Sequence, residues 1–321
     1  MKRILALVAI LALTVLNVLG QSGAKVSGDP NDAKIITSDI QNFWRAYDQA
    51  KPDNQVEVFE REYLNRGSEG LQDFIKLRIT SADALVKTIN GNPKYYGSIR
   101  ESTQRVEAMQ AKIRACFYAL KYLYSDAVFP DVYFVIGRMS SGGTLSKRGL
   151  LIGTEMYGRT ARTPEDELSD WHKQVLRPIE DAPYIVAHEL IHYQQKHGLQ
   201  LKKNLLYQSL NEGSADFIAE LVSGGNINPH LHAYGNPREK QLWEEFRQEM
   251  GGTDFGKWLY NGANTKDRPA DLGYYMGYKI VESYYNQMKD KRQAIKDILE
   301  IKDFTGFLKA SLYEAKFQTA R

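Results

Sequence analysis

Two histidines and a glutamate stand together in the stretch YIVAHELIHYQQKHG, as His188, Glu189 and His192. On an α-helix, side chains four residues apart lie on one face, about 6 Å apart along the axis. The two imidazoles can therefore converge on one metal ion, and Glu189 can reach a metal-bound water. A catalytic zinc ion takes three protein ligands and keeps one position for water, so a third ligand must come from elsewhere in the chain.

A second segment, LNEGSADFIAEL, offers that ligand as Glu212, twenty positions after His192 (212 − 192). Asp216 follows Glu212 by four residues and shares its helical face. Metal-bound histidines usually donate their second ring N–H to a carboxylate, and we expect Asp216 to accept that hydrogen bond from His188. The sequence therefore predicts one Zn²⁺ per chain, held by His188, His192 and Glu212.

Helical signals surround both segments. Asp181 and Pro183 are typical of a helix start and Gly198 of a helix end, so we expect the two histidines on one helix. Upstream, residues 35–125 carry apolar residues at spacings of three and four, which predicts a helical lobe. Cys116 falls within such a stripe, so we expect it to be a small buried hydrophobe.

Two strands are expected between the lobe and the histidine helix. Val132–Ile136 and Gly149–Met156 are apolar and rich in β-branched or aromatic residues. Their short, glycine-containing connection predicts an antiparallel pair. The fold class expected is therefore α+β and mostly α, with a small antiparallel sheet beside the histidine helix.

The HELIH and NEGSAD motifs resemble the gluzincin (thermolysin-like) metallopeptidases. Together with GYYMGYKI, they are similar to a bacterial family of uncharacterised predicted zinc-dependent proteases over roughly residues 130–290. The resemblance implies a zincin-like catalytic domain, Glu189 as general base and Asp216 in support of the ligands. The domains expected are a signal peptide at 1–20, a loose leader at 21–34, a helical lobe at 35–125 and a zincin-like catalytic domain at 126–321.

A gluzincin also needs a hydrogen-bond donor for the oxyanion. Tyr274 is our choice for this catalytic role, with Tyr275 and Tyr278 of the same segment as alternatives. His230 and His232 lie in a Gly/Asn/Pro-rich segment and are candidates by residue type. The sequence leaves this choice open.

The function implied is that of a zinc metallopeptidase that hydrolyses peptide bonds of a peptide or protein substrate by Glu189-assisted attack of a metal-bound water. Two alternatives stay open: a non-catalytic metal-binding protein of the cell envelope that binds a partner, and an amidase acting on cell-wall peptides. The intact Glu189 favours the enzyme, because a structural zinc site has no use for it. Substrate identity, exo- or endo-cleavage and oligomeric state are not fixed by the sequence.

The N-terminal segment and the net charge indicate where the protein is located and which partners it can bind. Residues 1–20 start with Lys2 and Arg3 and continue as an apolar run, which is typical of a signal peptide. An extracytoplasmic location, periplasmic or secreted, is therefore expected, with no stable membrane span after signal removal. No cysteine directly follows the apolar run to carry a lipid. The net charge of +3 over 321 residues argues against nucleic-acid binding.

Overall fold

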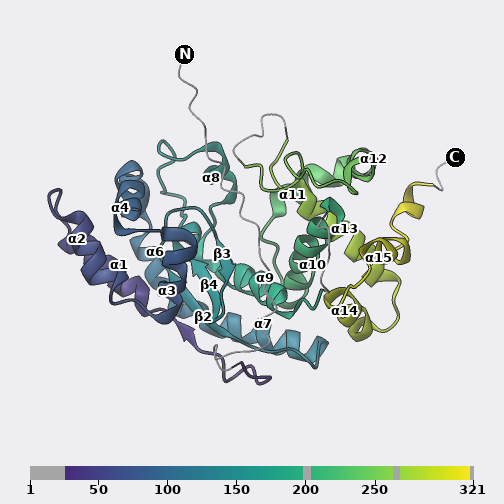
Figure 1. Ribbon diagram of the computed structural model, residues 1–321, viewed down its shortest axis with the longest axis horizontal. Helices are drawn as coiled ribbons and strands as arrows, with labels where there is room; N and C mark the ends of the chain where they lie inside the picture. The colour runs from purple at the N-terminus through teal and green to yellow at the C-terminus, as the bar shows by residue number, and fades with distance from the viewer. Residues whose placement is uncertain (1–25, 198–203, 263–267, 319–321) are drawn as a thin grey trace, which may run out of the picture.

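The computed structural model describes residues 26–197, 204–262 and 268–318. Helices dominate it, and a small four-stranded sheet lies between an N-terminal and a C-terminal group of helices (Figure 1). The expectation of a mostly helical α+β chain is confirmed. The signal peptide predicted at 1–20 and the helix end predicted at Gly198 lie outside the described residues.

Short helices build the N-terminal group. They are α1 (Ser38–Gln49), α2 (Gln55–Phe59), α3 (Glu69–Phe74), α4 (Ala82–Gly91), α5 (Pro93–Ser98) and α6 (Arg100–Gln104). Two π-helical turns, η1 (Glu60–Leu64) and η2 (Ile75–Ile79), continue α2 and α3. Aromatic residues hold the group together, since the ring of Phe43 contacts those of Trp44, Phe59, Tyr63 and Tyr96.

The sheet is mixed rather than antiparallel. Its order is β1 (Ile35–Ile36), β2 (Asp131–Val135), β4 (Gly149–Gly153) and β3 (Gly143–Leu145). β1 and β4 both run parallel to β2, and only β3 pairs antiparallel, with β4. The predicted antiparallel pairing of the two apolar strands is wrong because β3 forms the hairpin with β4. β2 and β4 are almost wholly buried, as parallel strands usually are.

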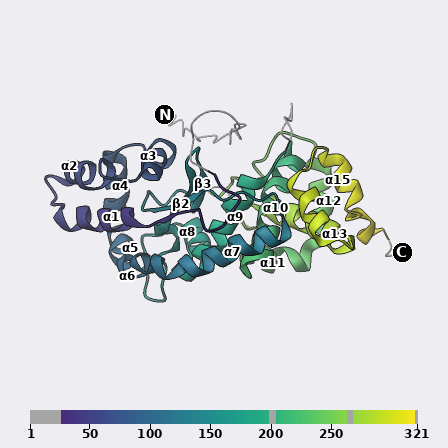
Figure 2. The same cartoon turned by 90° about the horizontal axis from the view of Figure 1, so that it is seen from below.

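Helix α7 (Gln110–Leu123) links the two groups of helices. Its predicted apolar stripe is buried at Ile113, Cys116 and Leu120. It packs against α9 (Ala182–Gln194) and α10 (Leu205–Ser223), along which it runs in Figure 2. The division of the chain after residue 125 stays a prediction, since β1 from the N-terminal part also pairs with β2.

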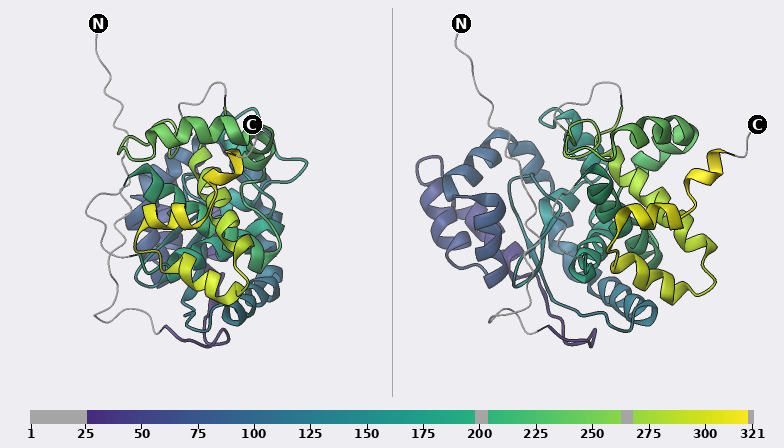
Figure 3. Two further views of the ribbon diagram at one scale, coloured as in Figure 1. Left: turned by 90° about the vertical axis from the view of Figure 1, so that its right-hand side faces the viewer. Right: turned by 45° about the vertical axis from the view of Figure 1, so that its right-hand side comes forward.

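The C-terminal group is built around α10, which lies between α9 and α13 (Leu272–Gln287). A Cβ on Gly277 of α13 would lie 1.7 Å from the carbonyl oxygen of Ser209, so α10 and α13 can approach this closely only with glycine there. The helices α11 (Pro229–Gly235), α12 (Glu239–Glu249), α14 (Lys291–Leu299) and α15 (Phe304–Ala310) complete this group, which is drawn in green to yellow in Figure 3. The short helix α8 (Asp170–Val175) lies toward the N-terminal group in Figure 1. Across the described ranges, none of the helices has the length and apolar character of a bilayer span.

Candidate metal centre and its cleft

Helix α9 lies in the interior of the molecule. It begins at Ala182 with Pro183 in its first turn, close to the start predicted from the sequence. Apolar side chains surround it on most sides, and nearly every residue from Ala182 to Ile191 is buried. His188 is therefore held in the core, where it is only 4% exposed, and His192 is partly buried beside it.

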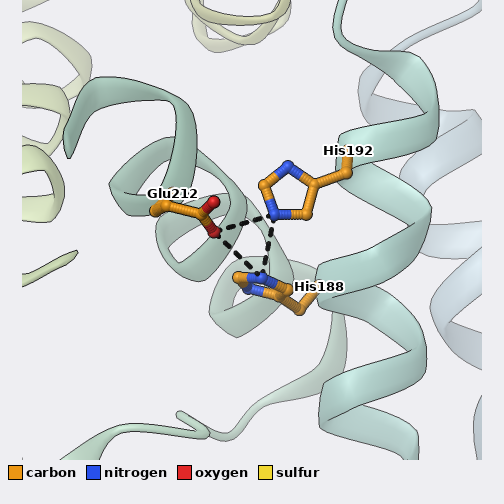
Figure 4. Close-up of side chains that lie close together, drawn as sticks. All are labelled: His188, His192 and Glu212. Atoms are coloured by element: carbon orange, nitrogen blue, oxygen red, sulfur yellow. Dashed lines mark hydrogen bonds and ion pairs between the residues drawn. The ribbon is translucent and has the colours of Figure 1, made fainter. Parts of the chain in front are cut away.

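The three predicted ligands meet between α9 and α10 (Figure 4). His192 Nε2 lies 3.0 Å from His188 Nε2 and 3.0 Å from Glu212 Oε2. His188 Nε2 lies 3.6 Å from the same Glu212 oxygen. Ligands arranged tetrahedrally about 2.0–2.1 Å from a zinc ion lie roughly 3.3–3.4 Å from one another. The spacing and the chemistry of these donors fit an ion of that size, so the group could hold a metal.

Each histidine also has a contact at Nδ1, the ring nitrogen that does not face the other ligands. Asp216 places Oδ1 2.8 Å from His188 Nδ1. Gln195 Oε1 lies 2.8 Å from His192 Nδ1, while its amide nitrogen donates to Asn211 O on α10. Sequence reasoning missed Gln195, although its position three residues after His192, one helical turn on, was a usable signal.

The electrostatics of the group favour a positive charge between the ligands. Burial alone would lower the pKa of His188, but its contacts with Asp216 and Glu212 raise it to about 10. Burial also works against the charged form of His192, and the charge of Glu212 raises its pKa overall. Glu212 shows the reverse: burial would raise its pKa, and the two histidines lower it. A cation bound here would be stabilised by the same carboxylates.

A cleft of about 860 Å³ opens beside the cluster, and all three ligands and Glu189 lie in its wall. Residues 140–145, which include β3, line it as well. Gly143 of β3 passes so close to α9 that a Cβ there would lie 2.5 Å from Glu189 Oε1. Burial raises the pKa of Glu189. The cluster is therefore reached through a cleft that an edge strand borders.

Of the five residues considered as oxyanion donors, Tyr274 alone lines this cleft within the described chain. Its ring stacks on that of His188 at 6.2 Å between centroids. The hydroxyls of Tyr275 and Tyr278 donate hydrogen bonds to Asn236 and Glu220, which do not line the cleft. His232 packs against the rings of both these tyrosines, and His230 has a buried Nδ1 without a hydrogen-bond partner.

Tyr260 is a cleft residue that sequence reasoning missed. Its hydroxyl donates to Glu212 Oε1 at 3.2 Å, and its side chain lines the cleft. Its backbone has a positive φ of 58°, and its N–H donates to Asp271 Oδ1 at 2.6 Å. Nothing local in the sequence marks Tyr260, because its partner lies 48 residues away.

Comparisons with known proteins give one result on the family and none on individual relatives. No curated protein and no solved structure matches the chain significantly. Residues 25–315, a span that includes α9, α10 and the cleft wall, match the model of a family described as Gliding motility protein GldB.

Proposed function

The chain belongs to the gliding motility protein GldB family, and from this premise we propose that it is a non-catalytic, metal-binding protein of the cell envelope that binds a partner in the metal-site cleft. The family is one of lipoproteins, which implies an N-terminal signal and a cell-envelope location. The single cysteine of the chain, Cys116, is buried in α7, so the proposal includes the envelope location and no lipid on a cysteine near the N-terminus.

Membership of this family corrects the interpretation of the chain as a gluzincin zinc metallopeptidase. The family is one of gliding motility proteins and is not a known peptidase family. The assignment as a zinc metallopeptidase is therefore wrong, and no comparison supports a peptide substrate. The roles given to Glu189 and Tyr274 stay predictions from the sequence. The HELIH and NEGSAD motifs indicate which side chains can bind a metal, but they do not indicate the function of that metal.

The observation that carries the proposal is the position of the three ligands in the cleft wall. A structural zinc site is normally closed by four protein ligands, whereas in the described part of the chain this group has three members. A bound metal would act as a Lewis acid that can accept a donor atom from a partner. We propose Zn²⁺, one per chain, with His188, His192 and Glu212 as ligands and Asp216 in support.

The proposal includes the scaffold. The helix α9, its ligand-bearing neighbour α10 and the edge strand β3 would be a zincin-like arrangement that is used for recognition. Two observations support this reading: β3 contacts α9 at Gly143, and α10 is fixed between α9 and α13. Such an arrangement keeps the metal site rigid and leaves the cleft as the place where a partner is met.

A gliding assay separates a binding role from a catalytic one. In a strain that lacks the gene, Glu189→Gln keeps the shape of the side chain and removes its ionisable carboxylate, so we expect gliding to be restored as by the wild type. Glu212→Ala removes a ligand, and we expect it to abolish gliding at equal protein level. Loss of gliding in the Glu189→Gln strain, with protein level, metal content and partner binding unchanged, would contradict the non-catalytic proposal.

A further inference from the structure

An unpaired arginine from the N-terminal group of helices reaches the cleft. Arg78, in the π-helical turn η2, lines the same cleft as the three ligands. Its Nη2 donates to Thr144 Oγ1 on β3 at 3.1 Å, and its Nε is buried without a hydrogen-bond partner. Among the described residues, no carboxylate lies within ion-pair distance of this guanidinium, although the charge of Glu189 acts on it.

The backbone that presents Arg78 has an unusual conformation. The π-helical turn ends at Thr80, a β-branched residue with a φ of +73°. β-branched residues rarely adopt positive φ, and π-helical turns are frequent at functional sites. Arg138 holds this end in place, because its Nη1 donates to Ile79 O at 3.2 Å and to Thr80 Oγ1 at 3.3 Å. The strained turn and its support fix the position of Arg78 at the cleft.

An unpaired guanidinium in this position is unfavourable without a ligand. Burial lowers the pKa of Arg78, which is the sign of a charge removed from water without a close partner. Arg148, which does not line the cleft, is different because its guanidinium contacts the carboxylates of Glu69 and Asp73. An anion entering the cleft would give Arg78 the partner that the described chain does not.

We infer that Arg78 anchors a carboxylate of an extended polypeptide segment that binds in the cleft, an inference that rests on the partner-binding function proposed above. A carboxylate fits better than a phosphate, because Asp170, Glu189 and Asp271 also line the cleft and repel a dianion more strongly. A polypeptide fits because β3 lies at the edge of the sheet and lines the cleft, so a segment can pair with its free side.

The test uses a random library of acetylated hexapeptides, in one form with a free C-terminal carboxylate and in another as the carboxamide. Zinc-loaded wild-type protein captures peptides from each form, and mass spectrometry of the bound fraction gives their composition. We expect enrichment of peptides with a carboxylate. A charge-assisted hydrogen bond predicts that Arg78→Gln weakens binding of an enriched acidic peptide roughly tenfold or more.

Two variants control for charge and folding. Arg148→Gln makes the same change of charge outside the cleft and should bind the acidic peptide as the wild type does. Arg78→Lys keeps the charge and should retain more affinity than Arg78→Gln. Zinc content and thermal unfolding of each variant establish that the fold and the metal site are intact.

Three results would overturn the inference. The captured peptides could show no preference for carboxylates, or the wild type and Arg78→Gln could bind the acidic peptide equally well. Inorganic phosphate could also displace bound peptides that have no enrichment in acidic residues. Failure of the proposed function has a different signature. It would appear as lost gliding in the Glu189→Gln strain, while the acidic preference and its dependence on Arg78 were still measured.

Discussion

Replacing Asp216 with asparagine is expected to weaken zinc binding by roughly 10- to 100-fold, about 1.4–2.7 kcal/mol of binding free energy. Asp216 Oδ1 lies 2.8 Å from His188 Nδ1, and both side chains are at most 5% exposed. The carboxylate therefore orients the ring and increases the basicity of Nε2, the atom that faces Glu212. The amide of asparagine has nearly the same shape but carries no charge, so the loss isolates this electrostatic support.

The affinity is measured by competition with a chromophoric zinc chelator at pH 7 and fixed ionic strength. Glu220→Gln is the matched control: it lies one helical turn further along α10 and accepts hydrogen bonds from Asn226 and Tyr278 rather than contacting a ligand. Wild-type affinity is expected for this control. An Asp216→Asn protein that binds zinc as tightly as the wild type, or an equal loss in both variants, would refute the reasoning.

Three further predictions concern the fold. Burial raises the pKa of Glu155 to about 7, so the folded state keeps the proton on this carboxyl to a higher pH than the unfolded state does. The free energy of unfolding that this proton contributes is fully present below about pH 4.5 and should be lost as pH rises through 7, by roughly 3 kcal/mol. The difference in free energy of unfolding between the wild type and Glu155→Gln, measured by chemical denaturation, should follow this course. Gly277→Ala places a methyl group against a backbone carbonyl and should lower the free energy of unfolding by about 1–3 kcal/mol or more. Gly91→Ala is the control and should not destabilise the protein, because no atom lies within 4 Å of the added Cβ. Equal melting temperatures of the two variants would contradict this prediction. Phe43→Ala removes a fully buried ring from the aromatic cluster and should cost about 3–5 kcal/mol in denaturant titration, and a cost below about 1 kcal/mol would show that the cluster does not stabilise the fold.

The elements that carry the metal ligands could be predicted because their signals are local. The spacing of His188 and His192 is a property of one helix, and Pro183 marks where that helix begins. The apolar stripe of α7 is local in the same way, and its buried positions were predicted correctly at Ile113 and Leu120. Helical periodicity reports which face is buried without any knowledge of the rest of the chain.

The pairing of the strands could not be predicted from the same kind of signal. β2 and β4 are apolar strands buried on both faces, and such a sequence does not indicate whether the neighbouring strand runs parallel or antiparallel. The short β3, with glycine at its start, lies within the segment that the sequence predicts as a connection between two strands. It became an edge strand because its hydrogen bonds with β4 close the hairpin.

Residues that reach the cleft from distant parts of the chain were also missed. Arg78 meets Thr144 across 66 positions, and Tyr260 meets Glu212 across 48. Neither pair follows from periodicity, since each depends on how the two groups of helices face the sheet. The function was predicted wrongly for a related reason: ligand spacing identifies a metal site, whereas its use depends on what enters the cleft.

The most direct test of the account is the zinc content of the purified protein, measured by mass spectrometry for the wild type and for Glu212→Ala. The account predicts about one zinc ion per wild-type chain and loss of that zinc in the variant, with the fold retained. A wild-type protein that holds no metal after zinc is supplied, or a Glu212→Ala protein that keeps a full complement, would contradict the claim that His188, His192 and Glu212 form a metal centre.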